Sequence, residues 1–392
     1  MFPAPPLLDR LRHALDSARY TTGSTHNFYL YPARFSPEVA RAVIKMFSER
    51  GDWILDPFMG GGTAIIEGLA LGRRMVGVDL NALAHFVAAA RTTPLSPQDE
   101  TAIRDWAQAA ARCARSSSPE SAPHIGNLPL TVRAFVADAL DRIALLPFPR
   151  QRAFARCVLL RLGQWALDCR DHAAPSRRRL AAKLPMLTDE MVSGLTDFVR
   201  ECRESGLRKS EIANSRILLC RNAGGLHEEV RLANLNIRPR LVFTSPPYPR
   251  VHVLYHRWQV RGRKETPAPY WIAQVPDGYY ASHYTGGSRT PTGEENYFAM
   301  IRSVFSSVRK LVAPDGLVVQ LLGFADIKNQ LPRYLAAMSD VGFEQWIPNH
   351  SQQRRLWRYV PNRKWYAKLQ GAVDASTEIL LFHRPRRPRL RT

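Results

Sequence analysis

The sequence has few of the features that mark secreted, membrane or zinc-binding proteins. Its five cysteines among 392 residues are an odd number, and no two of them have the CxxC spacing. A disulfide framework and a zinc knuckle are therefore not expected. No apolar run reaches the length of a membrane span, and residues 1–20 lack the apolar core of a signal peptide. We expect a cytoplasmic protein with no membrane partner and no bound metal.

Acidic residues are scarce relative to basic ones. Lys and Arg number 55 against 34 Asp and Glu, which gives a formal net charge of +21 at pH 7. Such an excess favours a polyanionic partner such as nucleic acid. Hydrophobic residues make up 45% of the chain, enough for a sizeable core in two domains or in one domain with a large insertion.

Alternating strand and helix patterns near both ends of the chain predict an α/β sheet. Toward the N-terminus a helix at 37–47 precedes a βαβ beginning, with strands at 52–56 and 75–79 around a helix at 63–71. Strand and helix patterns return toward the C-terminus at 241–243, 295–311, 317–324, 331–342, 343–347 and 378–383.

The middle of the chain has a different pattern. Ala, Arg and Leu dominate from about residue 93, and apolar residues repeat at helical spacing over 101–115, 150–170 and 187–205. This predicts a mainly helical insertion between two halves of the sheet. The expected division is an N-terminal half at 1–92, the insertion at 93–228, a second half at 229–384 and a basic tail at 385–392.

A glycine-rich turn, DPFMGGGT at 56–63, joins the first expected strand to a helix. Glycine lets the backbone adopt positive φ and approach a ligand closely. Asp79 ends the next strand, where a carboxylate can accept hydrogen bonds from ribose hydroxyls. Because Ile65 replaces the last glycine of a dinucleotide fingerprint and no GK[ST] follows, the turn suits a nucleoside cofactor without phosphates, such as S-adenosylmethionine. The alternative is a tight turn without a ligand.

The sequence TSPPY at 244–248 follows an expected strand, at an edge where open α/β sheets bind ligands. Pro246 and Pro247 hold a rigid turn, because neither can donate to a strand ladder. Ser245 and the carbonyl of Pro246 offer two acceptors to one amino group, and Tyr248 can stack on a flat ring. These features suit the exocyclic amine of a flipped-out nucleobase, whose lone pair becomes usable when its protons are drawn out of plane. The alternative is a proline turn with a core tyrosine.

Two stretches, at 250–264 and 345–373, combine basic and aromatic residues without any acid. The first directly follows TSPPY and includes Trp258, and the C-terminal stretch HRPRRPRLRT at 383–392 adds five more arginines. We expect both stretches to contact the phosphates of a nucleic acid, through Arg250, Arg257, Arg261, Arg263, Lys264, Arg354, Arg355 and Arg358. The alternative is solvated surface charge around core aromatics.

Taken together, these motifs resemble the amino-methyltransferases of DNA, whose motifs are DPFxGxGT and TSPPY. YPARFSPE at 31–38 is similar to the segment that helps hold the methionine end of the cofactor in this family, and GRRMVGVDLNALA at 72–84 to its second strand. The resemblance covers 26–90 and about 230–384, and the insertion lies where one class of the family carries its target-recognition region.

The resemblance implies a Rossmann-like methyltransferase sheet with helices on both faces, together with a set of site residues. The cofactor-binding residues would be Phe35, Asp56, Phe58, Gly60, Gly62, Thr63 and Asp79, and the catalytic residues would be Ser245, Pro246, Pro247 and Tyr248.

Two departures from the family concern the cofactor side. GGG stands where GSG is commoner, and Asn234 falls where the family often places an Asp near the adenine ring. Ser245 before PPY is more typical of enzymes that make N4-methylcytosine, whereas adenine enzymes usually carry Asp or Asn there. Methylation at carbon five of cytosine is not expected, because none of the cysteines follows a proline.

The expected activity is that of a site-specific DNA methyltransferase, of restriction-modification or orphan type, that methylates the exocyclic amine of a flipped base in double-stranded DNA. Cytosine N4 is favoured and adenine N6 is the alternative. A cognate restriction enzyme or another defence-system protein would be a partner. Two further alternatives are an RNA methyltransferase on the same fold and a nucleic-acid-binding protein that no longer catalyses.

Overall fold

The computed structural model describes most of the chain in a series of segments. These are residues 5–16, 23–30, 36–112, 125, 127–168, 173–249, 252–254, 257–260, 264–277, 283–285, 290–346, 356–359 and 377–387. None of the helices in these segments is both long enough and apolar enough to cross a membrane.

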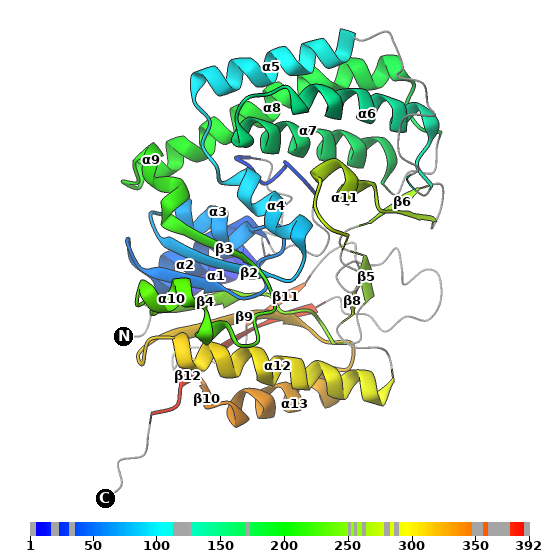
Figure 1. Ribbon diagram of the computed structural model, residues 1–392. Helices are drawn as coiled ribbons and strands as arrows, with labels where there is room; N and C mark the ends of the chain where they lie inside the picture. The colour runs from blue at the N-terminus through cyan, green and yellow to red at the C-terminus, as the bar shows by residue number, and fades with distance from the viewer. Residues whose placement is uncertain are drawn as a thin grey trace, which may run out of the picture.

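An eight-stranded mixed sheet lies at the centre of the molecule (Figure 1), in the order β10-β12-β9-β4-β1-β2-β3 with β11 also paired to β12. The strands are β1 (Trp53–Asp56), β2 (Arg74–Asp79), β3 (Arg216–Cys220), β4 (Leu241–Thr244), β9 (Leu317–Gly323), β10 (Phe343–Gln345), β11 (Leu356–Tyr359) and β12 (Thr377–Pro385). Strands β3, β2, β1, β4 and β9 are parallel, whereas β12 is antiparallel to its neighbours. The order reverses between β1 and β4. This is a Rossmann-like topology, in which ligands bind beyond the carboxyl ends of the strands at the reversal.

Side chains alternate across the sheet and divide the hydrophobic core in two. In β1, Ile54 belongs to one core and Leu55 to the other, and Phe243 and Val242 of β4 divide in the same way. Helices cover both faces (Figure 1). The Ile54 side carries α1 (Pro5–Asp16), α2 (Pro37–Phe47), α3 (Thr63–Ala70) and α4 (Ala82–Arg91), and the Leu55 side carries α10 (Val230–Asn234), α12 (Pro291–Leu311) and α13 (Ile327–Asp340). The expected α/β sheet with helices on both faces is confirmed.

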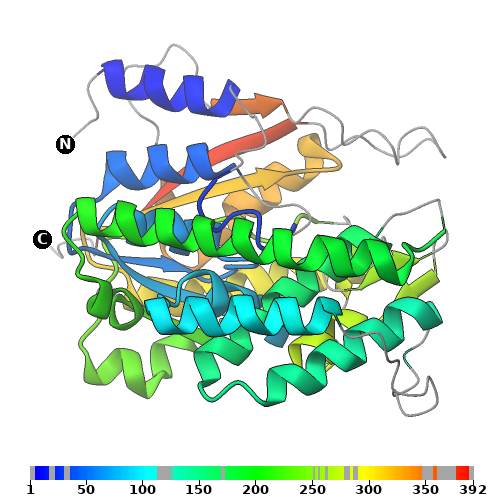
Figure 2. The ribbon, with the colours of Figure 1, turned by 90° about the horizontal axis from the view of Figure 1, so that it is seen from above.

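A further layer of helices covers α3 and α4. It consists of α5 (Pro97–Arg112), α6 (Leu130–Ala144), α7 (Pro149–Leu167) and α8 (Arg177–Glu204), and it ends in the short α9 (Lys209–Ile212). Helix α8 packs on α3 and runs beside α5, while α7 packs on α4 (Figure 2). Buried residues of this layer, such as Phe154 and Leu184, share one core with Ile54. The helical layer therefore rests directly on the sheet domain.

Strand β3 and helix α6 were not predicted from the sequence. Strand β3 comes from within the stretch 93–228, which was expected to be mainly helical, and it pairs with β2 from Arg216 to Cys220. Only Ile217 and Leu219 are buried in this edge strand. So short an apolar pattern does not distinguish a strand from the end of a helical region.

The chain between β4 and α12 forms several small elements beside the helical layer. They are the pair β5 (His252–Leu254) and β8 (His283–Thr285), the pair β6 (Trp258–Val260) and β7 (Lys264–Thr266), and α11 (Ala268–Ala273). Helix α11 packs on α7 and α4, and Figure 1 shows it at the end of the helical layer. Helix α11 and strand β6, which follow TSPPY in the chain, thus pack against the helical layer.

Candidate active site

The two motif turns lie side by side at the carboxyl ends of β1 and β4. These strands are parallel neighbours, with Leu55 opposite Val242. The hydroxyl of Thr244 donates a hydrogen bond to Oδ1 of Asp56 at 2.7 Å, and both residues are fully buried. The glycine-rich turn and the TSPPY turn therefore meet at the point where the strand order reverses.

The carboxylate of Asp79 is held against the glycine-rich turn. Its Oδ2 accepts a hydrogen bond from the N–H of Gly60 at 2.9 Å, and its Oδ1 accepts one from the N–H of Asn81 at 2.8 Å. Asn81 also caps α4, and its Nδ2 donates to the hydroxyl of Tyr270 in α11 at 2.8 Å. Sequence reasoning missed Asn81 and Tyr270. A cap residue directly before a helix could have indicated Asn81, but no local pattern indicates Tyr270.

The conformation of the turn requires its glycines. Gly60 and Gly62 have φ values of 49° and 83°, which residues other than glycine rarely adopt. A Cβ on Gly62 would lie 3.0 Å from the Cβ of Ala88 in α4. The buried Thr63 then begins α3. The glycines thus let the turn pass tightly between the end of β1 and the two helices.

Only one of the two carboxylate oxygens of Asp56 accepts hydrogen bonds from the described residues. Its Oδ1 accepts hydrogen bonds from Thr244 and from the N–H of Phe58 at 3.1 Å, whereas the buried Oδ2 has no hydrogen-bond partner among the described residues. Burial raises the pKa of Asp56 to about 7, although these two hydrogen bonds oppose the rise and nearby Asp79 adds to it. An ammonium group would satisfy Oδ2. The turn therefore fits a nucleoside that also bears an amino-acid group, as S-adenosylmethionine does.

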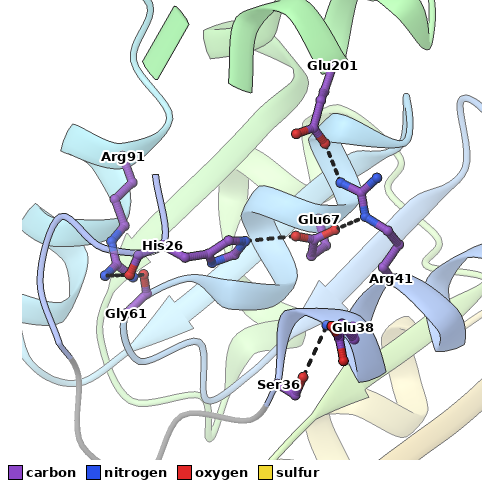
Figure 3. Close-up of polar contacts among 8 residues, drawn as sticks. All are labelled: His26, Ser36, Glu38, Arg41, Gly61, Glu67, Arg91 and Glu201. Atoms are coloured by element: carbon purple, nitrogen blue, oxygen red, sulfur yellow. Dashed lines mark hydrogen bonds and ion pairs between the residues drawn. The ribbon is translucent and has the colours of Figure 1, made fainter. Parts of the chain in front are cut away.

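Arg91 supports the glycine-rich turn from α4. It is 1% exposed, and it donates to the carbonyl oxygen of Gly61 at 2.5 Å and to that of His26 at 3.1 Å (Figure 3). It also donates to the carbonyl oxygen of Tyr29. The guanidinium therefore joins the turn to the N-terminal segment that leads to YPARFSPE.

An ionic network beside Arg91 fastens the helical layer to the sheet domain. Glu67 of α3 bonds to Nε2 of His26 at 2.8 Å and to Nε of Arg41 at 2.5 Å, and Arg41 also pairs with Glu201 of α8 (Figure 3). Ser36 caps α2 by accepting the N–H of Glu38 at 3.3 Å (Figure 3). Because α2, α3 and α8 all contribute to these contacts, the helical layer is held in one position relative to the turn.

All four residues predicted to be catalytic lie beyond the end of β4. Pro246 is buried, and Ser245, Pro247 and Tyr248 are partly exposed. The hydroxyl of Tyr248 donates to Oε1 of Glu378 in β12 at 2.6 Å. The structure thus adds Glu378 to the surroundings of the motif, a residue that no sequence pattern indicated.

Several of the predicted site residues lie outside the described residues, namely Phe35, Arg250, Arg261, Arg263, Arg354 and Arg355. Of the others, Lys264 is exposed on β7, and the half-buried Arg257 pairs with Asp277 at 2.9 Å. No group of three or more His, Cys, Asp or Glu side chains in the described segments could hold a metal ion.

Arg358, which was expected to contact a nucleic acid, lies in the interior, and so does Trp258 of the first basic stretch. Arg358 is 8% exposed and donates to Oε2 of Glu378 at 3.0 Å, so it is a buried ion-pair partner. Trp258 is 1% exposed and donates through Nε1 to the hydroxyl of Tyr29 at 3.1 Å. Charge and aromatic content along the chain did not distinguish these interior positions from surface ones.

Asn234 also lies in a different place from the one expected. It is the exposed last residue of α10. The chain next to Asp79 comes instead from the end of β3, where the N–H of Arg221 donates to the carbonyl oxygen of Asp79 at 2.9 Å. Cys220 and Arg221, rather than Asn234, therefore lie next to Asp79.

Comparison with known proteins gives matches to short stretches of the chain. Residues 13–89 match a family model described as DNA methylase, the N6/N4 methyltransferase family. Type II methyltransferase M.MvaI of Kocuria varians is 40% identical over 76 residues, which are 19% of this chain and 17% of that protein. Type II methyltransferase M.BsoBI of Geobacillus stearothermophilus is 38% identical over 63 residues, 16% of this chain and 12% of that protein.

An RNA enzyme matches in the same way. A tRNA (guanine(10)-N2)-dimethyltransferase of Methanothermobacter thermautotrophicus is 41% identical over 54 residues, 14% of this chain and 16% of that protein. The chain thus matches less than a fifth of the length of each of these curated relatives.

Solved structures of methyltransferases resemble the chain only distantly. TrmN from Thermus thermophilus has a TM-score of 0.32 at 13% identity over 92% of this chain and 51% of that chain. The rRNA methyltransferase aviRa from Streptomyces viridochromogenes has a TM-score of 0.33 at 9% identity over 95% of this chain and 92% of that chain. The fold class therefore rests on the strand order described above.

The strand order and the two turns at its reversal define a Rossmann-like fold of the kind that methyltransferases have. Within that fold, residues 13–89 match the model of the N6/N4 DNA methylase family, and the chain is similar over short stretches to type II methyltransferases.

Proposed function

We propose that the protein is a DNA methyltransferase that transfers a methyl group from S-adenosylmethionine to the exocyclic amine of a flipped base. The observation that carries this proposal is the hydrogen bond of 2.7 Å between Asp56 and Thr244, which joins the glycine-rich turn to the TSPPY turn. A methyl donor bound at the first turn would lie next to an amine held at the second. Placement of this kind supplies much of the rate in group-transfer reactions.

The cofactor would be held by groups on both sides of the glycine-rich turn. Asp79 would accept hydrogen bonds from the ribose hydroxyls, because the N–H groups of Gly60 and Asn81 hold its carboxylate at the end of β2 beside the turn. Leu80 follows directly and is 46% exposed, which offers an apolar surface for the face of an adenine ring. The spare Oδ2 of Asp56 would accept the ammonium of the methionine part. The bound cofactor would supply an electrophilic methyl group on its sulfonium.

The amine would be held by the turn after β4. The hydroxyl of Ser245 and the carbonyl of Pro246 would accept its two protons, and the proline ring of position 247 would keep these acceptors in place. With its protons drawn toward these acceptors, the nitrogen presents its lone pair to the methyl group. Fixed acceptors lower the cost of this arrangement, because they need no reorientation during the reaction.

Cytosine N4 is the favoured target, with adenine N6 as the alternative. The choice rests on Ser245, whose neutral hydroxyl is typical of the cytosine enzymes that this motif resembles. Double-stranded DNA would be the substrate, and the exposed Lys264 would contribute to phosphate contacts. The role of the helical layer in target recognition and the existence of a cognate restriction enzyme belong to the same proposal.

A second candidate is an amino-methyltransferase that acts on structured RNA. The observation that favours it is the similarity to a tRNA (guanine(10)-N2)-dimethyltransferase, because the N2 of guanine is also an exocyclic amine. The chemistry at Ser245 and Pro246 would be the same. Only the polymer and the base would differ.

The test is mass spectrometry of nucleosides from unmethylated duplex DNA, and from tRNA in parallel, after incubation with the protein and S-adenosylmethionine. N4-methylcytosine is the expected product, and the matched control is Ser245→Ala at equal concentration, which should form far less. N6-methyladenine would keep the mechanism and change the base, whereas an N2-methylguanine product from tRNA alone would favour the second candidate. Cofactor binding without any methylated nucleoside would point to a binding protein that does not catalyse.

A further inference from the structure

Three strands carry a row of residues beside the TSPPY turn. Glu378 of β12 lies opposite Gly323, the last residue of β9, and also opposite Arg358 of β11. Residues directly opposite on neighbouring strands project to the same face of a sheet. The positions 323, 378 and 358 therefore share one face, at the edge of the sheet where β4 ends.

The ring of Tyr248 lies against Gly323, which has no side chain to exclude it. A Cβ on Gly323 would lie 2.9 Å from Cε2 and 3.0 Å from Cδ2 of the Tyr248 ring, so a larger residue would force the ring to move. From this position the hydroxyl reaches Oε1 of Glu378 at 2.6 Å. The absence of a side chain at position 323 thus permits the contact made at position 378.

An ion pair shielded from water orients the carboxylate that holds Tyr248. Oε2 of Glu378 accepts a hydrogen bond from Nη1 of Arg358 at 3.0 Å. Glu378 is 2% exposed and Arg358 is 8% exposed. A charged pair with such low exposure makes directional hydrogen bonds and has few alternative arrangements. The carboxylate is therefore a fixed acceptor for the tyrosine hydroxyl.

We infer that Gly323, Glu378 and Arg358 are positioning residues that fix the ring of Tyr248, on which the target base would stack. The inference rests on the proposed function. A phenol has one O–H proton, and in this structure Glu378 receives it. The hydroxyl cannot donate the same proton to a base. A ring that is already fixed loses little rotamer freedom when a base stacks on it.

A double-mutant cycle between Tyr248 and Glu378 tests this inference. Tyr248→Phe removes only the hydroxyl, Glu378→Gln removes the charge, and the third variant combines both changes. Each single change should lower kcat about tenfold, because a ring displaced by a fraction of an ångström no longer holds the base correctly. The combined variant should lose no more than the worse single variant, and the dissociation constant for S-adenosylmethionine should stay the same in all three.

Two further variants distinguish a local displacement of the Tyr248 ring from a general loss of folding. Tyr334→Phe is the matched control, because the Tyr334 hydroxyl also has a buried side-chain partner: it accepts from Nε2 of Gln320 at 2.7 Å, and Gln320 projects to the opposite face of β9 from Gly323. It should leave kcat within about twofold. Gly323→Ala displaces the ring while Glu378 and Arg358 stay intact, and it should lower kcat as Tyr248→Phe does.

The outcomes separate this inference from the proposed function. Losses that multiply in the combined variant would show that Glu378 acts independently of Tyr248, and this would overturn the inference while leaving the methyltransferase in place. Full activity of Gly323→Ala would overturn it as well. A wild-type protein that methylates neither DNA nor RNA would instead overturn the proposed function, and the positioning role with it.

Discussion

Thr244 donates its hydroxyl proton to Asp56 at 2.7 Å, across two neighbouring parallel strands. Thr244 ends β4 and directly precedes Ser245, and Asp56 ends β1 and begins the glycine-rich turn. A bond between these two positions holds the turns at a set separation. A methyl donor on one turn and an amine on the other would then meet at that separation.

The raised pKa of Asp56 predicts that cofactor binding depends on pH. The pKa is about 7 in the free protein, and an ammonium group beside Oδ2 would favour the ionised form. Affinity for S-adenosylmethionine should therefore weaken as the pH falls below 7, by up to about tenfold per pH unit. Titration calorimetry at pH 6 in buffers of different ionisation enthalpy should show that a proton is released on binding.

The control for this experiment is Asp56→Asn, which keeps the shape of the side chain but cannot ionise. It should bind the cofactor more weakly at pH 8, with no proton release attributable to this position. Wild-type affinity that is the same at pH 6 and pH 8 would contradict the assignment of Asp56 to the ammonium group.

The same pKa predicts how Asp56 affects stability when no cofactor is bound. In the unfolded chain this carboxyl ionises near its ordinary value of 3.8, whereas in the folded protein it keeps its proton to about pH 7. Its contribution to stability is therefore complete below about pH 4 and is lost as the pH rises toward 7. The free energy of unfolding of wild type relative to Asp56→Asn should fall by about 3 kcal/mol between pH 4.5 and 7.5. Urea unfolding of both proteins measures this, and a constant difference would refute it.

Arg91→Lys should disturb the glycine-rich turn. Lysine cannot reach the carbonyl oxygens of Gly61, His26 and Tyr29 with the planar geometry of a guanidinium, so at least one buried carbonyl would lose its donor. We expect a loss of about 2 kcal/mol in the free energy of unfolding, together with weaker cofactor binding. The half-buried Arg104 of α5, which pairs with Asp189 at 2.9 Å, offers the matched control, because Arg104→Lys makes the same chemical change away from the turn. Equal stability of the two variants would show that Arg91 does not support the turn.

Tyr270→Phe should weaken cofactor binding with little effect on turnover at saturation. The Tyr270 hydroxyl accepts a hydrogen bond from Asn81, whose own N–H bonds to Asp79. Loss of this contact loosens the support of the Asp79 carboxylate, which we propose binds the ribose, and we expect the dissociation constant to rise about fivefold. Calorimetry and steady-state kinetics measure the two effects separately. If kcat fell while the dissociation constant stayed the same, Tyr270 would belong to the base side of the site.

Local patterns predicted the parts of the fold that short stretches of sequence specify. The strand ending at Asp56 and the strand before Ser245 are short apolar runs with proline shortly after them. The turn through Gly60 and Gly62 is marked by its glycines. The structure confirms each of these elements. Strand β3 was missed because its apolar content is confined to a few positions on the sheet edge.

Contacts between distant parts of the chain could not be predicted from sequence patterns. Tyr248 and Glu378 are 130 positions apart, and Asn81 and Tyr270 are 189 positions apart. Arg358 was expected at the surface because it lies among other basic residues, but its position in the sheet places it beside Glu378. Burial of a charge depends on which strand becomes its neighbour, and a linear pattern does not contain that information.

The measurement that tests the central claim most directly is a comparison of cofactor binding by wild type, Asp79→Ala and Ser245→Ala, using titration calorimetry with S-adenosylmethionine. If the glycine-rich turn binds the cofactor and the TSPPY turn holds the amine, Asp79→Ala binds S-adenosylmethionine at least about tenfold more weakly than wild type. Ser245→Ala then binds it as wild type does. Equal losses in both variants, or wild-type binding by Asp79→Ala, would contradict the assignment of the cofactor to one turn and the amine to the other.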